Sequence, residues 1–371
     1  MENKVYDIII LWAGASGLFC ASQILDSLSV LILEWGDSPA KKLLMSAKWR
    51  WNITNLNIDP RKDYVSDDSD FIFSAFEKFW IKDFLGFLNE KWIETKEENN
   101  GRILLKSGKV SEFKERLVNL VLEKWIEIKY NSEFMSARKT TNRTFEIKTS
   151  SWIYFAKNLI VATWWPSFPQ LWASWVAIEI AWDFGLETTP FYPALVWFET
   201  KQDFSLLSGS SVVGELNLMK WNNSIYEENW PILFTHRWIS WPAVFNTSLF
   251  IRENFYEKSS DFKVRISVSA KEITKRLLSF LRFRSNSLKE YKISTDIVKV
   301  RWLDEAKVCW WWVKLKNLNP DFECKRIEWL YFIWECLDTT GKTWWFNLQR
   351  CWTSWANCAT GINKKFLNFK F

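Results

Sequence analysis

The chain has 371 residues, which is long enough for two domains with hydrophobic cores of their own. Its net charge is +6, and no block of like charge marks an arm that binds nucleic acid. No apolar run approaches the length of a membrane span, and the six cysteines lack metal-binding spacing. A single histidine excludes a multi-histidine metal site. Because no export signal is evident, we expect a cytoplasmic protein with reduced thiols.

The first stretch with a recognisable architecture runs from Tyr6 to Glu34. Apolar runs at 8–11 and 30–33 predict two buried parallel strands, and the pattern over 16–27 predicts a helix between them. A β-turn-α-β unit that ends in an acid is the architecture that binds a dinucleotide. We therefore expect the turn at Gly14 and Gly17 to hold a pyrophosphate and Glu34 to bond the adenosine ribose.

The turn of this unit departs from the G-x-G-x-x-G pattern, because Trp12 stands where the first glycine belongs. The whole chain shows the same anomaly, with 28 Trp and only 11 Gly. Many of these tryptophans follow strand ends or lie in turns, where we expect positive φ: Trp164, Trp165, Trp238, Trp241, Trp310, Trp311, Trp312, Trp334, Trp344 and Trp345. We interpret most of them as glycines misread from UGA codons, which some bacterial lineages are expected to translate as glycine. The alternative is a genuinely tryptophan-rich protein.

With that substitution, the chain resembles bacterial FAD-dependent oxidoreductases of the aminoacetone-oxidase-like or NAD(P)/FAD-dependent type, whose relatives include a reductase of bile-acid degradation. The matching stretches occur in the family's order along nearly the whole chain: 6–34, 41–55, 99–110, 159–175, 193–196, 232–246 and 328–355. The resemblance implies an α/β fold. A Rossmann-like FAD-binding domain of the glutathione-reductase type (1–190 and 320–371) would carry an inserted, mainly β substrate domain (191–319).

The pattern between these stretches agrees with that organisation. It predicts helices at 71–89 and 111–124, a small β segment at 94–109 and a strand at 126–130. Three alternating runs over 134–156 form a meander that returns to a strand at 159–162. Short strands with one helix, 271–283, dominate the inserted domain, and a strand at 330–333 leads into the last helix.

The resemblance also implies a set of cofactor-binding residues. Glu335, with Asp338 as the alternative, would bond the ribityl hydroxyls of FAD. The N-terminus of the last helix would face the N1–C2=O edge of the flavin and stabilise its reduced, anionic form. On charge alone, the basic loop that holds Lys42 and Arg50 would be a solvated loop. The full set is Trp12, Gly14, Ala15, Ser16, Gly17, Glu34, Lys42, Arg50, Asn52, Phe134, Thr163, Glu335, Asp338, Trp345, Phe346 and Asn347.

These inferences predict an FAD-dependent oxidoreductase that acts on a small organic substrate, without a nucleic-acid or membrane partner. No second dinucleotide fingerprint appears, so NAD(P)H and oxygen both stay open as electron partners. The one catalytic candidate is His236, read either as a polar group on the flavin's substrate side or as a structural histidine that bonds a turn carbonyl. Two other functions stay open: a tryptophan-rich module that stacks nucleic acid or sugar, and a flavin-binding protein without turnover.

Overall fold

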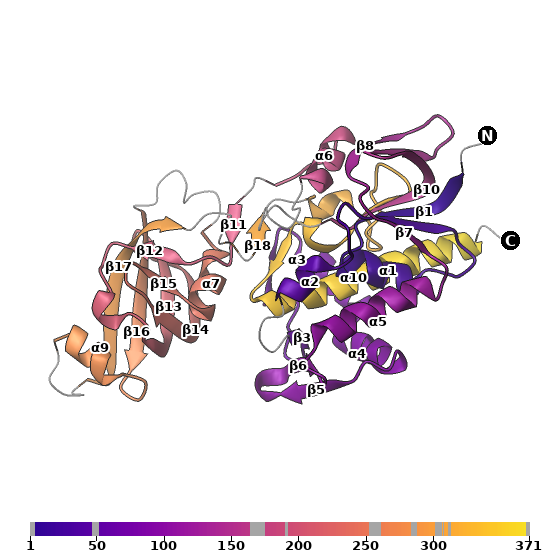
Figure 1. The fold of residues 1–371 in the computed structure, drawn as a ribbon. Helices are drawn as coiled ribbons and strands as arrows, with labels where there is room; N and C mark the ends of the chain where they lie inside the picture. Colours follow the sequence, from indigo (N-terminus) through magenta and orange to yellow (C-terminus); the bar gives the residue numbers. More distant parts are fainter. Residues whose placement is uncertain are drawn as a thin grey trace. The chain divides into compact units, whose positions relative to one another are not determined.

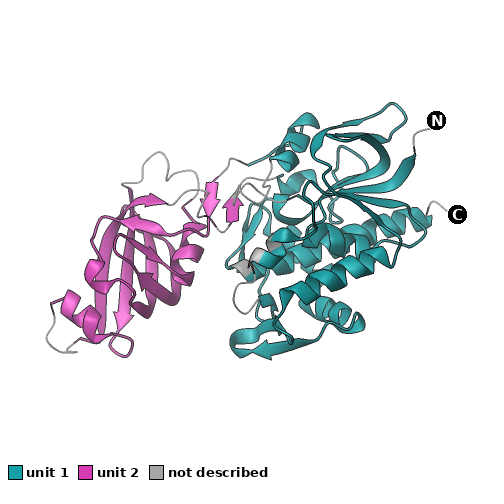
Figure 2. Ribbon diagram, in the orientation of Figure 1, with its two compact units in different colours: residues 1–189, 311–371 teal, residues 190–310 magenta. Residues whose placement is uncertain are grey.

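The computed structural model describes residues 4–46, 52–163, 175–189, 192–251, 261–282, 288–300, 306, 308–310 and 313–368. The chain forms two compact units (Figures 1 and 2). Unit 1 comprises Met1–Thr189 and Trp311–Phe371, and unit 2 comprises Pro190–Trp310. None of the described helices is long and apolar enough to cross a membrane.

The core of unit 1 is a sheet whose central strands are parallel. Its order is β7-β2-β1-β10, and β19 pairs with the second half of β10. These strands are β1 (Val5–Leu11), β2 (Val30–Leu33), β7 (Glu127–Lys129), β10 (Ile153–Val161) and β19 (Leu330–Phe332). All four residues of β2 are buried, as expected for a parallel strand covered on both faces.

The predicted meander is present as an antiparallel extension of the same sheet. It consists of β8 (Phe134–Lys139), β9 (Phe145–Thr149) and the first half of β10. The strand predicted at 159–162 is the second half of β10, so one strand serves both the meander and the parallel core. One continuous strand therefore leads from the meander to the edge where β1 ends.

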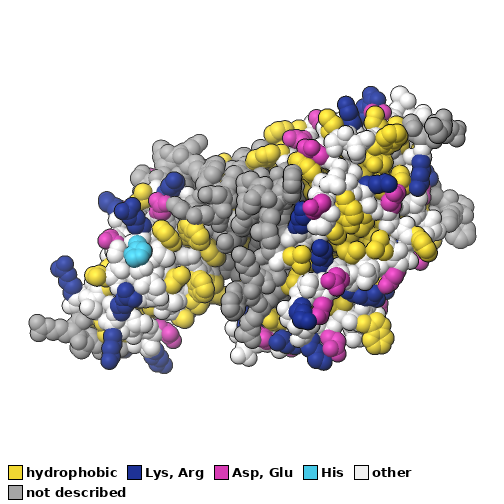
Figure 3. All heavy atoms as spheres, in the orientation of Figure 1, with side chains coloured by type: hydrophobic (Ala, Val, Ile, Leu, Met, Phe, Trp, Pro, Cys, Tyr) yellow, Lys and Arg dark blue, Asp and Glu magenta, His cyan; other side chains and the backbone are white. Residues whose placement is uncertain are grey.

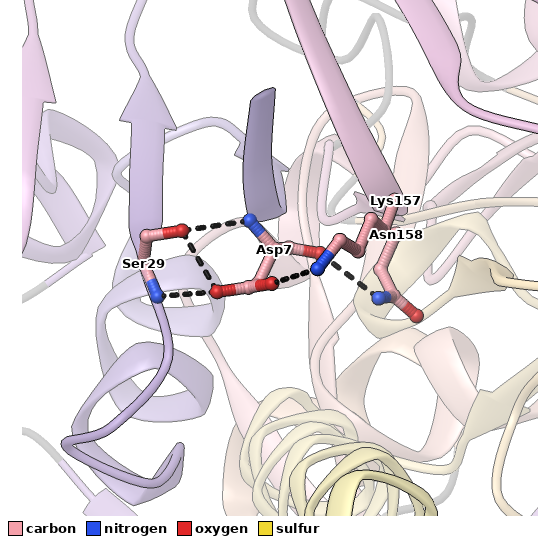
Figure 4. Close-up of polar contacts among 4 residues, drawn as sticks. All are labelled: Asp7, Ser29, Lys157 and Asn158. Carbon is pink, nitrogen blue, oxygen red and sulfur yellow. Dashed lines mark hydrogen bonds and ion pairs between the residues drawn. The ribbon is translucent and has the colours of Figure 1, made fainter. Parts of the chain in front are cut away.

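A polar cluster ties together the amino ends of the central strands (Figure 4). The Asp7 carboxylate accepts hydrogen bonds from the backbone N–H and the hydroxyl of Ser29, at 2.9 and 2.8 Å. Its other oxygen lies 2.8 Å from Lys157 Nζ, and the Asn158 amide donates to the Asp7 carbonyl at 2.9 Å. The cluster joins β1 to the start of β2 and to β10. It therefore helps to fix the register that aligns their carboxyl ends.

Replacing Asp7 with Ala is expected to lower the free energy of unfolding at neutral pH by about 1.5–3 kcal/mol, the scale of hydrogen bonds to a charged group. Burial raises the pKa of Asp7, but the bonds from Lys157 and Ser29 outweigh it and hold the pKa below its usual value. The stabilisation is therefore present above the unfolded-state pKa and is lost as the pH falls through the folded-state pKa. Urea unfolding at successively lower pH should show the stabilities of parent and variant converging once the Asp7 carboxylate is protonated in the folded state. If the difference in the free energy of unfolding between parent and variant stayed the same in acid, the stabilising role of the Asp7 carboxylate would be contradicted.

Helices cover the sheet and carry the rest of unit 1. The helix α1 (Ala15–Gln23) packs against both α5 (Val110–Leu122) and the long α10 (Trp344–Asn368) (Figure 1). Around α10 lie α3 (Ser69–Lys78), α4 (Ile81–Glu90), β3 (Asn52–Asn55) and β20 (Thr339–Gly341). A small sheet joins β3 to β6 (Arg102–Leu105) and β5 (Thr95–Glu98), while β20 pairs with β4 (Tyr64–Ser66). The remaining helices are α2 (Lys41–Ser46) and α6 (Val176–Asp183).

Unit 2 is a closed barrel with the order β12-β15-β14-β13-β16-β17. Its strands are β12 (Phe198–Thr200), β13 (Ser211–Lys220), β14 (Asn223–Phe234), β15 (Trp238–Ser240), β16 (Phe262–Ser269) and β17 (Glu290–Val300). The helix α7 (Pro242–Ser248) packs on β14, and α9 (Lys275–Phe280) lies between β16 and β17 in the chain. At the ends of the unit's chain, β11 (Tyr192–Ala194) pairs with β18 (Val308–Trp310). The predicted fold class, a Rossmann-type domain with an inserted β domain, is confirmed.

Two predicted helices differ from those observed. The helix predicted at 71–89 is broken into α3 and α4, because Phe79 is extended and the Trp80 N–H bonds the Asp83 carboxylate at 2.7 Å. The helix predicted at 271–283 is only α9, which begins after Thr274, whose hydroxyl accepts from the N–H of Leu277. In both cases a side chain that caps the helix sets the boundary.

The expectation of positive φ is wrong for some of the tryptophans. Trp238 lies in the strand β15, and Trp344 and Trp345 begin the helix α10, with ordinary backbone angles. Glycine at a helix start serves close approach rather than an unusual φ, so the sequence pattern alone did not separate the two requirements. Other tryptophans do have positive φ, and they are considered below.

Candidate cofactor site

The parallel strands of unit 1 end together. Leu11 of β1 pairs with Leu33 of β2 and Val161 of β10, and Val161 pairs with Phe332 of β19. The segments that follow these strands therefore meet at one edge of the sheet. In open α/β sheets, ligands bind at the carboxyl edge.

The turn between β1 and α1 is held against the end of β10. The Ser16 hydroxyl donates to the Ala162 carbonyl at 3.1 Å, and Ala15, Ser16 and Gly17 are all buried. A Cβ on Gly17 would lie only 2.0 Å from the Trp12 carbonyl oxygen, so this position requires glycine. Trp12 itself has φ 83°, a left-handed angle that glycine adopts readily and tryptophan resists.

Glu34 closes the turn from the other side. Its carboxylate accepts the N–H of Ala13 at 2.9 Å and the N–H of Gly36 at 2.8 Å, and the residue is 7% exposed. Each carboxylate oxygen keeps a lone pair for a hydroxyl donor such as a ribose. Burial raises the pKa of Glu34 more than the hydrogen bonds from Gly36 and Ala13 lower it.

Replacing Glu34 with Ala is expected to weaken FAD binding by about 1–3 kcal/mol, the scale of a hydrogen bond to a charged group. Glu34 is expected to accept the ribose hydroxyl as a carboxylate, and its pKa is raised. The affinity of the parent protein for FAD should therefore fall as the pH is lowered through that pKa. The variant should lack this dependence, which fluorescence titration across mildly acidic pH measures. Equal affinities, or identical pH profiles, would mean that the ribose contact is misassigned.

The start of α10 forms the second wall of the candidate site. The Asn347 amide accepts from Gly341 N–H at 2.8 Å and donates to the carbonyls of Gly341 and Thr343. Tyr64 donates its hydroxyl to the Phe346 carbonyl at 2.7 Å. These bonds fix the turn from β20 into the helix, whose first N–H groups have no partner within the helix. Asn347 thus already uses both amide hydrogens to hold the turn.

Several buried polar atoms near these elements have no hydrogen-bond partner among the described residues. They include both amide atoms of Asn52, the hydroxyls of Thr163, Thr339, Thr340 and Thr343, and all three guanidinium nitrogens of Arg350. Thr163 follows β10 and Asn52 begins β3. Thr339 and Thr340 lie on β20, Thr343 lies in the turn that follows it, and Arg350 lies in the second turn of α10. Leaving a buried donor or acceptor unpaired costs about 1–3 kcal/mol, and more for a charged group. A polar cofactor with phosphate, ribityl and flavin oxygens fits this set.

Arg350 was not found by sequence reasoning. It is 3% exposed, and its positive charge acts to lower the pKa of both Tyr64 and Cys336, although burial keeps both pKa values raised. Side chains on a helix point toward its N-terminus, so Arg350 extends toward the turn of Phe346 and Asn347. A signal was available, because Arg350 is the only charged residue in the run Thr343–Ile362.

The other candidate residues lie as follows. Glu335 and Asp338 are buried just after β19, at the carboxyl edge of the sheet. Phe134 begins β8, and Ser132, two residues earlier, bonds the Glu34 carbonyl at 2.9 Å. The side chain of Lys42 and the whole of Arg50 lie outside the described residues.

His236 belongs to unit 2. Its side chain is exposed, and its carbonyl accepts the Phe204 N–H. In the described part of the chain, no group of three metal-ligating side chains is present. All six cysteines are buried, and none of them forms a disulfide bond among the described residues. Burial raises the pKa of Cys336 to about 12, so it stays a thiol.

This fold and site define a class: Rossmann-type flavoproteins with oxidoreductase activity that use FAD. The family model described as "HI0933-like protein Rossmann domain" matches residues 6–361, and the chain belongs to this family. It is 29% identical to the ribosomal RNA dihydrouridine synthase of Haemophilus influenzae, over 96% of this chain and 98% of that protein. It is 23% identical to the 3-dehydro-bile acid delta(4,6)-reductase of Clostridium scindens, over 93% and 96%.

Among solved structures, the chain is similar in fold to a 3-ketosteroid-delta4-(5alpha)-dehydrogenase from Rhodococcus jostii. The TM-score is 0.56 at 10% identity, over 98% of both chains. The predicted kinship with a bile-acid reductase and the predicted flavoprotein class are therefore confirmed.

Proposed function

We propose that this protein is an FAD-dependent reductase that adds a hydride and a proton across a carbon–carbon double bond conjugated to a carbonyl, and that its substrate is uracil in ribosomal RNA. The proposal rests on the full-length similarity to two relatives. Their names describe the same chemistry, because dihydrouridine is uridine saturated at a double bond next to a carbonyl, and a delta(4,6)-reductase saturates bonds conjugated with a ketone. This proposal replaces the sequence-based expectation of a small organic substrate and no nucleic-acid partner. A small unsaturated ketone is the second candidate.

Under this proposal, the residues of the site have two roles: some bind the cofactor, and others stabilise the negative charge of the reduced flavin. Glu34 and the turn at Gly14 and Gly17 hold the adenosine and pyrophosphate. When bound, FAD would supply the hydride, and we propose NAD(P)H as the reductant. The N-terminus of α10 and the Arg350 guanidinium would supply positive charge to the bound flavin, which becomes anionic on reduction. We assign none of the described residues as the acid that donates the proton to the substrate.

We also propose that many of the 28 printed tryptophans are glycines in the natural protein. Among the described residues, fifteen other than glycine have positive φ, and seven of these are tryptophans: Trp12, Trp92, Trp125, Trp221, Trp241, Trp329 and Trp334. Trp241 combines φ 87° with ψ 176°, a region that is essentially restricted to glycine. Tryptophan has no property that favours these angles.

Three helix ends give a direct comparison within the chain. After α6, Gly185 has φ 66°, its N–H bonds the Trp182 carbonyl, and the next N–H bonds the Ala181 carbonyl. This is the Schellman motif, in which glycine is the usual residue. Trp92 after α4 and Trp125 after α5 make the same pair of bonds, at φ 59° and 58°. Their side chains are 89% and 94% exposed, so packing does not compensate for the strain.

Some tryptophans do not have the positive φ angles that favour glycine. Trp352 is fully buried, donates its indole N–H to the Ile53 carbonyl at 2.9 Å, and stacks on Phe84 with ring centroids 4.6 Å apart. It behaves as a genuine core residue. The codons of the gene should therefore fall into two sets, one for genuine tryptophans such as Trp352 and one for the glycine positions.

The genomic sequence is expected to read UGG at Trp352 and UGA at the positions that we assign to glycine. UGG throughout would remove the recoding proposal. The chain with glycine at the assigned positions is called the glycine-restored chain below. Those positions are Trp12, Trp49, Trp92, Trp125, Trp164, Trp165, Trp221, Trp238, Trp241, Trp329, Trp334, Trp344 and Trp345.

The reaction is tested with the FAD-loaded glycine-restored chain, NADH or NADPH, and ribosomal RNA transcribed in vitro, which carries no modification. Nucleosides from the digested RNA are then analysed by mass spectrometry. Dihydrouridine at defined positions is expected. Reduction of cyclohex-2-enone without any dihydrouridine would favour the second candidate. No reduction of either probe would contradict the proposed function.

A further inference from the structure

The positive charge of this protein is concentrated in one part of unit 2. The stretch 262–300 holds ten Lys and Arg residues but only three Asp and Glu, a net charge of +7, whereas the whole chain carries +6. The remainder of the chain is therefore close to neutral. Such a concentration is the electrostatic footprint of a partner rich in phosphate.

The barrel turns these charges outward. In β16, Val264 and Ile266 point into the core, whereas Lys263 and Arg265 are exposed. The neighbouring antiparallel strand β17 exposes Lys292 and Lys299. We call these four residues, Lys263, Arg265, Lys292 and Lys299, the basic face. Figure 3 shows Lys and Arg side chains spread over the visible surface of unit 2.

Acidic neighbours neutralise only part of this surface. Asp296 lies 3.6 Å from both Lys201 and Lys263, and Glu290 lies 3.0 Å from Lys292. Within the described ranges, Arg265 and Lys299 have no ion pair. The connection between the two strands adds further exposed cations, Lys271, Lys275 and Lys289. Lys263 and Arg265 are two residues apart on β16, hence about 7 Å from each other, and Ser267, the next residue on that side, pairs with Lys292. These cations of the basic face therefore form a row rather than a pocket.

We propose that the basic face binds the phosphate backbone of the RNA substrate. The inference rests on the proposed function, which supplies a polyanionic substrate, and adds the surface that holds it. A row of exposed Lys and Arg on a strand pair suits a backbone, since phosphate contacts position RNA without reading its bases. Unit 1, which carries the candidate FAD site, then has to recognise only the reacting base.

The test neutralises the basic face in the FAD-loaded glycine-restored chain with Lys263→Gln, Arg265→Gln, Lys292→Gln and Lys299→Gln. Its matched control carries the same loss of charge on exposed positions of unit 1: Lys82→Gln, Lys96→Gln, Lys106→Gln and Lys148→Gln. Binding of in vitro transcribed ribosomal RNA is measured by filter retention between about 50 and about 200 mM KCl. Flavin content, read from visible absorbance, reports whether each variant is folded.

The basic-face variant is expected to lose about three units of the slope of log K against log salt, since each phosphate contact contributes about 0.7–0.9. Its affinity should fall at least about tenfold, and the control should match the parent. Equal losses in both variants, or no loss in either, would overturn the inference. If the parent yields dihydrouridine and the basic-face variant binds RNA as tightly as the parent, only this inference fails. A parent that binds no RNA would overturn both proposals, and binding of anionic lipid vesicles alone would assign the face to a membrane.

Discussion

The glycine-restored chain is expected to purify as a yellow, FAD-loaded protein, whereas the printed chain is expected to be insoluble or colourless. A residue with a Cβ in a left-handed or glycine-only region costs about 1–3 kcal/mol. Seven described tryptophans have such angles, so their combined cost is on the order of 7–20 kcal/mol. That range meets or exceeds the 5–15 kcal/mol that holds a typical domain together. Trp12 would in addition place an indole at the turn that must approach a pyrophosphate.

Expression of both chains side by side, followed by gel filtration and an absorbance spectrum, measures this difference. A third chain that also carries Trp352→Gly is the matched control, because it replaces a tryptophan that is buried, bonded and stacked. This control should lose about 3–5 kcal/mol relative to the glycine-restored chain, the usual cost of truncating a core aromatic. Soluble, FAD-loaded protein from the printed chain would contradict the recoding proposal.

Replacement of Arg350 with Met is expected to have opposite effects on the apoprotein and on cofactor binding. The guanidinium is buried, and none of its nitrogens has a partner among the described residues. Its removal should therefore stabilise the apoprotein by about 1–4 kcal/mol, because an uncompensated buried charge disappears. If the cofactor supplies the missing acceptors, the same change should weaken FAD binding by about 2–5 kcal/mol.

Urea unfolding of the apoprotein and fluorescence titration with FAD measure the two effects separately. Arg350→Lys keeps the charge and should retain part of the FAD affinity without stabilising the apoprotein, which separates charge from packing. A purely structural role would move both quantities in the same direction. Loss of apoprotein stability together with unchanged FAD affinity would therefore remove Arg350 from the site.

Much of the Rossmann core could be predicted from the sequence, because its signals are local. The residues 30–33 are all apolar and form the buried strand β2 with these bounds. Gly17 could be expected from the fingerprint alone, and the 2.0 Å approach of the Trp12 carbonyl gives the reason. The break between α3 and α4 was missed because it depends on one capping bond from Trp80 to Asp83 within a continuous apolar pattern.

The rest of the site depends on residues that are distant in the sequence. Arg350 is the one charge in the run Thr343–Ile362, but only the structure shows that its guanidinium is buried without a hydrogen-bond partner among the described residues. The barrel likewise brings β16 and β17 together, so that charges thirty residues apart share one surface. The excess of Lys and Arg over 262–300 is visible in the sequence, but only the pairing of β16 with β17 shows that these charges share one surface.

The most direct test of the proposed reaction is a single turnover without oxygen. The FAD-loaded glycine-restored chain is reduced with one equivalent of dithionite and mixed with ribosomal RNA transcribed in vitro, and the visible flavin absorbance is followed. The account predicts that the absorbance of oxidised flavin returns, with one dihydrouridine formed for each flavin reoxidised. Reduced flavin that persists in the presence of both the RNA and cyclohex-2-enone would contradict the reductase that we propose.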